Sequence, residues 1–447
     1  MAKIQCSDIT RELKDLFSDA VIRDLAQASG FVQRERKLDV VAFFWTLVLG
    51  FGLKQSRTIA GLRCSYATAT GETFAPSAFY DRFNERLLDM LKEALKIGLE
   101  SFSIGWGCTD EIAQAFTDVL LTDSSVIKLH DSLRHVFPGC RTNCAPAAAK
   151  LHAVVSVKGK GKSTVALSAG RVHDSKKLTI GSWVRDNLLM FDLGYFGYKL
   201  FTRIAEEHGY FLSRMKLNAN PLLVSNLGAQ GPGAIPVEGE YLQDILKSIR
   251  RDVLDVQAKV LFRRRGYNGH QSAGTSSFRV VAVRDKTTGE YHTYITNIPP
   301  EMLDAQAVAA CYRARWLVEL LFKELKGGYR LDQIPSRRRE IVESLLYAAL
   351  LTLVTSRRLF QLLATQDRAR RYTPGRWWSL FAANAHTILL AVLHPRLAET
   401  LLKNLLATLR HELGDPHRAR VPLLFETLEC YAPKSTTSRR QPMVKRA

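Results

Sequence analysis

The chain lacks the features that mark secreted and membrane proteins. Its seven cysteines are an odd number scattered over 447 residues, so they do not form a disulfide framework, and a reducing compartment is expected. The most apolar runs, Val40–Leu53 and Leu345–Val354, are too short to span a bilayer and are typical of buried helices. The opening residues, MAKIQCSDIT, contain no apolar signal core. We therefore expect a soluble, intracellular protein with no membrane partner.

Two kinds of ligand site are also poorly supported. Cys140 and Cys144 lie near His130 and His135, but no second cysteine pair follows at zinc-finger spacing, which disfavours a zinc site. The glycines of residues 228–239 do not lie between a strand and a helix, so they do not predict a nucleotide-binding loop. The sequence also has no repeat of fixed period.

Acidic residues are outnumbered by basic ones. The chain has 63 Lys and Arg against 43 Asp and Glu, a formal net charge of +20. This excess favours a polyanionic partner such as nucleic acid, because each neutralised phosphate releases counterions; the alternative is a basic protein without such a partner. Basic clusters are concentrated after residue 248, which favours a surface that positions phosphates rather than one that reads bases. They are Arg263–Arg265, Arg337–Arg339, Arg357–Arg358 and Arg368–Arg371.

The periodicity of apolar residues changes along the chain. Residues 8–104 repeat apolar positions every three or four residues, which predicts helices. From about residue 116, short β-rich runs are separated by polar turns, and a helix pattern at Tyr198–His208 is followed by a strand at Tyr210–Met215. This order indicates an α/β domain with a mixed sheet. The earlier predicted strands are Val119–Thr122, Val126–Leu129, Ala153–Val157, Val165–Ser168 and Leu188–Phe191.

The second half of the chain alternates between β-rich and helical segments. Residues 218–300 are β-rich, with strands predicted at Lys259–Arg263, Ser277–Val283 and Tyr291–Thr296. A helix is predicted at 301–326, because Pro299-Pro300 precede it and Gly327-Gly328 end it. A further apolar helix covers about Arg339–Leu363, and the remaining sequence to about residue 431 is mostly helical.

One face of the 301–326 helix carries an unusual set of side chains. At about 100° per residue, a tyrosine, two cations and a carboxylate fall within an arc of roughly 60°. These residues are Tyr312, Arg315, Glu319 and Lys326. The roughly opposite side carries Leu317, Leu321 and Leu325, which would anchor the helix in a core. A metal-binding carboxylate among phosphate-binding groups explains this face; the alternative is a solvated face with a Glu319–Lys323 pair.

Two aspartates strengthen the metal hypothesis. Asp123 and Asp192 each follow an apolar strand, and carboxylates at strand ends beside a sheet crevice are placed to bind ligands. With Glu319 they could hold two Mg²⁺ ions about 3.5–4 Å apart, which suits phosphodiester chemistry. The alternative for either Asp alone is a turn or a helix cap. Asp174 is a second candidate for the role of Asp192, although it is better placed to cap a helix that starts near Ser175.

These residues together resemble the YREK-type DDE transposases of bacterial insertion sequences, the insertion sequence four family. The signature reads YRARWLVE from Tyr312 to Glu319, with Lys326 at the required distance. Upstream, LTDSSVI around Asp123 resembles the first-Asp block, and KLH at Lys150–His152 resembles the strand after it. DLGYFGYKLF from Asp192, with RMK at 214–216, resembles the second-Asp block. The resemblance covers about residues 115–355.

The resemblance implies an RNase H-like, mixed-sheet α/β catalytic core interrupted by a β-rich insertion, with helical N- and C-terminal domains. We accordingly divide the chain into six parts. They are a helical DNA-binding domain (1–105), the first part of the catalytic core (106–217), the insertion (218–300), the second part of the core (301–365), a helical region that contributes to dimerisation (366–433) and a basic disordered tail (434–447).

The resemblance also implies the site residues. Asp123, Asp192 and Glu319 would bind two Mg²⁺ ions, which Mn²⁺ can replace. Tyr312, Arg315 and Lys326 would hold the transposon-end backbone. The candidates for further DNA contacts are Arg214, Lys216 and Lys323. In relatives an aromatic residue of the insertion stacks on a flipped base; because no Trp occurs between Trp183 and Trp316, the candidates here are Tyr291 and Tyr294, with Tyr267 as a third.

The function implied is cut-and-paste transposition. Element ends would be cleaved, through a hairpin, and the freed 3′-hydroxyl joined to target DNA. The expected partners are double-stranded DNA, as transposon ends and target, and a second copy of the chain in a homodimer on DNA; no small-molecule substrate is expected. The expected location is the bacterial cytoplasm, at the nucleoid. Two alternatives stay open: a catalytically silent derivative that acts as a repressor or inhibitor, and a structure-specific nuclease.

Overall fold

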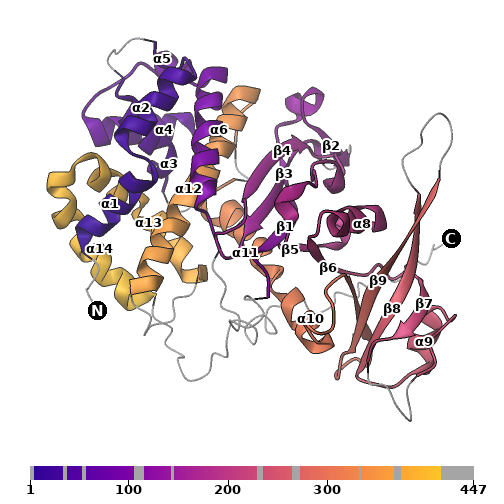
Figure 1. Cartoon of the computed structure of the whole chain (residues 1–447). Coiled ribbons are helices and arrows are strands. Elements are labelled where there is room, and N and C mark those ends of the chain that lie inside the picture. Colours follow the sequence, from indigo (N-terminus) through magenta and orange to yellow (C-terminus); the bar gives the residue numbers. More distant parts are fainter. Residues whose placement is uncertain are drawn as a thin grey trace, which may run out of the picture.

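The computed structural model describes residues 5–33, 38–52, 57–104, 115–141, 145–228, 235–263, 272–331, 334–366 and 374–413. Helices from both ends of the chain gather on one side of a large sheet (Figure 1). The N-terminal helices are α1 (Cys6–Leu16), α2 (Asp19–Ala28), α3 (Val40–Leu49), α4 (Ile59–Thr70), α5 (Pro76–Tyr80) and α6 (Glu85–Glu100). The C-terminal helices are α12 (Arg339–Gln366), α13 (Pro374–Leu393) and α14 (Ala398–Glu412), with the short η6 (Pro395–Leu397) before α14.

The middle of the chain forms the sheet and its short helices. The strands are β1 (Val119–Lys128), β2 (Pro138–Arg141), β3 (Ala145–Ser156), β4 (Thr164–Ala169), β5 (Leu188–Phe191), β6 (Tyr210–Arg214), β7 (Leu222–Asn226), β8 (Val253–Arg263), β9 (Ala273–Arg284) and β10 (Tyr291–Thr296). The helices between them are η1 (Asp131–His135), η2 (Asp174–Lys176), η3 (Ser182–Val184), η4 (Leu193–Tyr195), α8 (Tyr198–Glu206) and α9 (Leu242–Ser248). After β10 come α10 (Ala305–Arg313), α11 (Trp316–Lys323) and the π-helical turn η5 (Glu324–Gly328).

Among the described residues the ten strands make one mixed sheet. Its order is β2-β3-β1-β5-β6-β10-β9-β8-β7. Strand β4 lies off this path and pairs with β3. Strands β1 and β3 are antiparallel, whereas β5 is parallel to β1 and β6 is parallel to β5. Helix α8 connects β5 to β6, as parallel neighbours require. The predicted α/β class with a mixed sheet is therefore confirmed.

Strand β1 differs from its prediction. The sequence predicted two runs, Val119–Thr122 and Val126–Leu129, with Asp123 at the end of the first. The structure has one strand, because the backbone of Asp123, Ser124 and Ser125 stays paired with β3. The prediction that Asp123 ends a strand is therefore wrong. Three polar side chains interrupt the apolar pattern, but backbone pairing does not depend on side-chain polarity.

The β-rich region that was predicted at 218–300 extends the main sheet. Strand β10 pairs with β6 on one side and with β9 on the other, so the hydrogen-bonded ladder is continuous. A buried ion pair braces this half of the sheet: the Arg279 guanidinium donates to both carboxylate oxygens of Asp255, at 2.8 and 2.7 Å. Arg279 also donates to the carbonyls of Ile298 and Leu303, which ties the sheet to the segment before α10.

Helices from the two ends of the chain share one core. Helix α6 packs along α12, and α1 packs against α14. The close approach of α6 and α12 needs Gly98, since a Cβ there would lie 3.0 Å from a methyl group of Val354. Buried Arg57 donates to the Leu47 carbonyl at 2.7 Å and to the Thr352 hydroxyl at 2.8 Å. The helices predicted as separate N- and C-terminal regions are thus packed together. No helix in the described ranges is long and apolar enough to cross a membrane.

The two faces of the sheet belong to different cores. Val119 and Leu121 of β1 face the core shared with α11 and the helical body, whereas Leu120 faces the core that includes residues of α8 and α9. Successive side chains of a strand alternate between faces. Asp123 therefore continues the series on the α11 face, and Thr122 lies on the α8 face. This alternation decides which side chains can reach Asp123.

Candidate active site

Asp123 and Asp192 lie side by side on neighbouring parallel strands. Thr122 of β1 is the register partner of Phe191 of β5, and each aspartate is the next residue. Asp192 directly follows β5, as predicted, and precedes η4 without making a side-chain cap hydrogen bond. The alternative in which Asp192 is a helix cap is therefore not supported. The side chain of Asp123 is 15% exposed and accepts a hydrogen bond from the Ser124 backbone at 2.7 Å.

Glu319 approaches this pair from the helix that packs on β1. It lies in the first turn of α11, which contacts β1. The sequence predicted one helix over 301–326, but α10 ends at Arg313 and α11 begins at Trp316. Tight hydrogen bonds from Leu317 to Ala314 and from Val318 to Arg315 close this junction. The predicted single helix is therefore wrong. The side chains from Tyr312 to Lys326 do not project from one continuous α-helix.

The apolar side of α11 follows the prediction. Leu317, Leu321 and Leu325 are buried in the core beneath the sheet, at 6%, 3% and 2% exposure. Their burial fixes the rotation of α11, so that Glu319 keeps its place near the edge of β1 with 30% of its side chain exposed. The anchoring role proposed for these leucines is confirmed.

Arg315 joins two of the three carboxylates. Its guanidinium hydrogen-bonds to Glu319, and one of its nitrogens lies 3.7 Å from Oδ2 of Asp123. The partner of Glu319 in the structure is thus Arg315 and not Lys323, which is exposed at the end of α11. The Arg315 side chain is only 12% exposed. A nearly buried cation therefore lies between the acids.

The titration of the site reflects both burial and crowding of charge. Burial raises the pKa of Asp123 from 3.8 to about 6, and the negative charges of Asp192 and Glu319 contribute in the same direction. Burial alone would lower the pKa of Arg315, but Tyr312, Glu319 and Asp192 raise it above its ordinary value. Asp123 is thus electrostatically coupled to the other two carboxylates, and all three interact with the Arg315 guanidinium.

Tyr312 supports the strand end that carries Asp192. Its hydroxyl donates to the Phe191 carbonyl at 3.0 Å, one residue before Asp192. The ring packs on Tyr294, with centroids 5.3 Å apart, and the Arg315 guanidinium lies over the same ring at 5.7 Å. Burial raises the pKa of Tyr312 to about 12. The geometry assigns Tyr312 a positioning role toward β5.

The other predicted DNA-contact and stacking residues surround this corner at different depths. Arg214 and Lys216 are exposed at the end of β6; Arg214 bonds to His292 at 2.9 Å, and the Lys216 amine lies 5.5 Å from the Phe196 ring centroid. Lys326 is half-buried in η5. Of the candidate stacking residues, Tyr294 is buried and Tyr291 donates to the Arg251 carbonyl at 2.6 Å. Tyr267 lies outside the described residues.

Asp174 has a different environment from its prediction. It does not cap a helix; His173 caps η2, and Asp174 accepts from the Ser124 hydroxyl at 2.7 Å and from the Lys150 amine at 3.1 Å. Because Ser124 and Asp123 point to opposite faces of β1, Asp174 lies across the strand from Asp123. The cap prediction is wrong since a histidine ring nitrogen already accepts the Ser175 amide.

The donor set fits a hard divalent cation. All three side chains offer carboxylate oxygens, the ligands that Mg²⁺ prefers. In the part of the chain that the structure describes, no three acidic, His or Cys side chains already form a group arranged to hold a metal. Instead the Arg315 guanidinium is the cation between Asp123 and Glu319. The residues thus accommodate positive charge at this point, which is the property that a metal site requires. For the disfavoured zinc site, Cys140 is a free, exposed thiol and Cys144 lies outside the described residues.

Comparison with known proteins identifies the family of the chain. Residues 114–355 match the family described as Transposase DDE domain. The transposase for insertion sequence element IS231F of Bacillus thuringiensis subsp. israelensis is 23% identical over 374 residues, which cover 76% of this chain and 77% of the relative. The transposase for insertion sequence element IS1151 of Clostridium perfringens is 21% identical over 376 residues, 78% of this chain and 79% of that one.

Among solved structures, a piggyBac transposase synaptic complex with hairpin DNA is similar at a TM-score of 0.44 and 12% identity, over 92% of this chain and 86% of that one.

The family match spans nearly the same stretch, 115–355, over which the sequence resembles insertion-sequence transposases. The predicted family is therefore confirmed: this chain belongs to the DDE-domain transposases of insertion sequences.

Proposed function

We propose that the chain cuts and joins DNA in cut-and-paste transposition, with Asp123, Asp192 and Glu319 as its catalytic carboxylates. The observation that carries this proposal is their convergence: the aspartates follow register partners on adjacent parallel strands, and Arg315 links Asp123 to Glu319. The raised pKa of Asp123 supports it, since perturbed acids cluster at functional sites.

The three carboxylates would hold two Mg²⁺ ions, or Mn²⁺ in their place. When bound, such ions lower the pKa of an attacking water or 3′-hydroxyl and stabilise the leaving oxygen of a phosphodiester. The chain's own residues hold the acids in position. Tyr312 fixes the end of β5 through the Phe191 carbonyl, and the leucines of α11 fix the helix that carries Glu319.

Arg315 has two roles in this proposal. Without DNA and metal it offsets the repulsion between Asp123 and Glu319, because its guanidinium contacts both carboxylates. With positive ions at the carboxylates, its guanidinium is free to bind a phosphate of the element end, for which the planar fork is suited. Exposed Arg214, Lys216 and Lys323 would add phosphate contacts nearby, together with Lys326.

DNA is the partner that this reaction requires, and the net charge of +20 is consistent with it. We propose that cleavage passes through a hairpin, that two copies of the chain hold two element ends and that residues 366–433 contribute to this dimer, at the nucleoid of the bacterial cytoplasm. The mass of the complex with element-end DNA tests the dimer: two chains per pair of ends are expected, and one chain per end without pairing would contradict it.

The direct test of function is cleavage of DNA that carries the element ends, in Mg²⁺ or Mn²⁺. Glu319→Gln should lower the cleavage rate at least about a hundredfold, because a group that stabilises the transition state is lost. Glu301→Gln, an exposed position just before α10, is the matched control and should cleave normally. Joined target products identify a transposase rather than a structure-specific nuclease. DNA binding by the unaltered chain without any metal-dependent cleavage would identify a silent derivative and contradict the proposal.

A further inference from the structure

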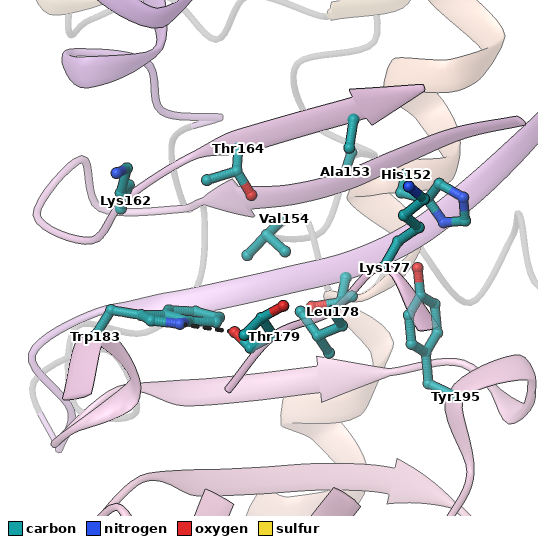
Figure 2. Close-up of a pocket in the computed structure, with 12 residues that line it drawn as sticks. His152, Ala153, Val154, Lys162, Thr164, Lys177, Leu178, Thr179, Trp183 and Tyr195 are labelled. Carbon is teal, nitrogen blue, oxygen red and sulfur yellow. Dashed lines mark hydrogen bonds between the residues drawn. The ribbon is translucent and has the colours of Figure 1, made fainter. Parts of the chain in front are cut away.

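Exposed lysines border a cleft on the face of β1 opposite to Asp123. The cleft is a cavity of about 300 Å³. In Figure 2, Lys162 and Trp183 lie at one end of it, and Lys177 and Tyr195 lie at the other. Among the residues that the structure describes, its lining contains two lysines and no acid. The cleft is therefore suited to a negatively charged ligand.

The lysines at one end of the cleft belong to a rigid turn. This turn joins β3 to β4 and reads Lys-Gly-Lys-Gly-Lys over residues 158–162. The buried carboxylate of Asp118 accepts hydrogen bonds from three of its backbone amides, those of Lys158 at 2.9 Å, of Lys160 at 2.8 Å and of Gly161. Gly161 allows this close packing, because a Cβ there would lie 2.8 Å from a neighbouring methyl group. The backbone is fixed from inside, so the exposed side chains of the turn start from fixed positions.

The exposed charges around the cleft have one sign. The only acid in residues 159–177 is Asp174, which accepts a hydrogen bond from the Lys150 amine at 3.1 Å. The exposed hydroxyls of Thr164 and Thr179 also line the cleft. Ammonium groups and hydroxyls are the groups that contact the phosphates of a nucleic acid. The exposed cations of this stretch are Lys160, Lys162, Arg171, Lys176 and Lys177.

One end of the cleft reaches the carboxylates from behind. Thr122 lines the cleft and immediately precedes Asp123. Tyr195, at the end marked by Lys177, follows Asp192 by three residues. A DNA strand that lies along the cleft and continues past Tyr195 therefore arrives at the edge of the sheet where the acids lie.

The other face of the sheet already has a DNA partner in the proposed function. Arg315 and Lys323, which would hold the element end, lie at the two ends of α11 on the Asp123 face. Joining brings two DNA molecules, the element end and the target, to one set of acids, so each needs a surface of its own. Contacts from lysine to phosphate carry no sequence information, which suits the target better than the element end that the protein must recognise.

We propose that this cleft and the turn at 158–162 bind the phosphate backbone of target DNA. This inference rests on the proposed function, since it needs a joining reaction. Lys160 and Lys162 contact phosphates at one end of the cleft, and Lys177 contacts a phosphate at the other. The target is thereby held behind β1 while the element end occupies the face that carries Asp123.

The first test measures capture of target DNA without catalysis. The full chain is bound to precleaved element-end DNA in EDTA. Its affinity for a labelled duplex that lacks the end sequence is then measured by fluorescence anisotropy at several salt concentrations. Each phosphate contact that is lost should lower the slope of log affinity against log salt by about one.

Lysine variants assign the capture to the cleft. The double variant Lys160→Ala/Lys162→Ala should lower the affinity about tenfold and the salt slope by about two, whereas Lys160→Arg/Lys162→Arg should retain both. Lys177→Ala should lower the affinity about threefold, and Lys403→Ala, an equal change of charge on exposed α14, should leave it unchanged. Unchanged affinity and salt slope in the double alanine variant and in Lys177→Ala would overturn the proposal.

The second test separates the target from the element end. In Mg²⁺ the double alanine variant should cleave element ends at the normal rate and join them to a target plasmid about tenfold more slowly. An equal loss of end cleavage would show that this face holds the element end, which would overturn the proposal. Glu319→Gln should lose cleavage and still capture the target duplex in EDTA, so failure of the proposed catalysis and failure of this surface give different results.

Discussion

Two glutamate–arginine pairs have glutamates only five residues apart in sequence but have different surroundings. Glu319 pairs with Arg315 on α11, with 30% and 12% of their side chains exposed. Glu324 in η5 pairs with Arg357 of α12, at 1% and 4% exposure. The pairs contain the same chemical groups. Only the first is beside other acids and open to solvent, so only the first can exchange its cation for another.

The second pair is sealed inside a hydrogen-bonded network. Tyr329 donates to Glu324 at 2.6 Å and contacts the Ser356 hydroxyl, which also accepts from the Trp377 indole at 2.8 Å. The chain packs tightly there, since a Cβ on Gly328 would lie 2.8 Å from the Trp378 ring. This pair joins the helix that carries Glu319 to the C-terminal helices. The surroundings, and not the ion pair itself, therefore distinguish a candidate ligand-binding pair from one that joins helices.

The largest effect should be on the cleavage rate, after substitution of an acid beside the Glu319–Arg315 pair. Asp192→Asn should lower metal-dependent cleavage at least about a hundredfold, since it removes a carboxylate that faces Asp123 and Arg315. Asp174→Asn is the matched change on the other face of β1 and should lower the rate far less. Rates of end cleavage under single-turnover conditions measure both. Equal losses would mean that Asp174 belongs to the metal site.

A Glu→Gln substitution at the buried Glu324–Arg357 pair should affect folding instead of cleavage. Glu324→Gln leaves Arg357 buried without its counter-charge and should lower the free energy of unfolding by about 3–5 kcal/mol. Glu319→Gln should change it by less than about 1 kcal/mol, because that pair is partly exposed. Urea denaturation of the two variants measures both values. A stable Glu324→Gln protein would remove the distinction between the pairs.

The raised pKa of Asp123 should make the free energy of unfolding depend on pH. The pKa of Asp123 is raised from 3.8 to about 6 in the folded chain, so the folded state binds this proton more tightly than the unfolded state. Without metal, the resulting stability is fully present below pH 3.8 and is lost as pH rises through about 6; it amounts to about 3 kcal/mol at most. Denaturation between pH 4 and 7 should show this fall. Asp123→Asn should abolish it, and an unchanged slope in that variant would contradict the assignment.

The smallest expected effect is on the positioning of Asp192. Tyr312→Phe removes the hydrogen bond to the Phe191 carbonyl and should cost about 1 kcal/mol of stability. Cleavage should slow several-fold, and a higher Mg²⁺ concentration should restore part of the rate. Tyr347→Phe, a half-buried tyrosine in α12, is the control. A variant with normal stability and metal dependence would show that Tyr312 does not position β5.

The sequence predicted the candidate acids but not all of their surroundings. Apolar runs before Asp123 and Asp192 predicted a strand before each of them, and the leucine spacing of α11 predicted its buried side; both follow from local periodicity. The length of β1 was missed because polar side chains at Asp123–Ser125 hide a continuous backbone ladder. The pairing of Arg315 with Glu319 is an i,i+4 contact, the same spacing as the Glu319–Lys323 alternative, so helix periodicity alone could not decide between the two.

Features that join distant segments were out of reach of a single sequence. The shared core of α1, α3, α13 and α14 requires contacts between opposite ends of the chain. Nothing in the pattern around Thr122 or Trp183 predicts that they line one cavity. The domain boundaries and the DNA contacts stay predictions.

If the acids around Arg315 bind divalent metal, the chain should bind Mn²⁺ in the absence of DNA. Electron paramagnetic resonance of the full chain, titrated with Mn²⁺, reports bound ions without any need for DNA cleavage. A pH of about 7.5 is suitable, because it lies well above the pKa of about 6 at which Asp123 ionises. Binding should be saturable, strongly weakened in Asp123→Asn and Glu319→Gln, and unchanged in Glu301→Gln. Equal Mn²⁺ binding by the unaltered chain and by both carboxylate variants would contradict it.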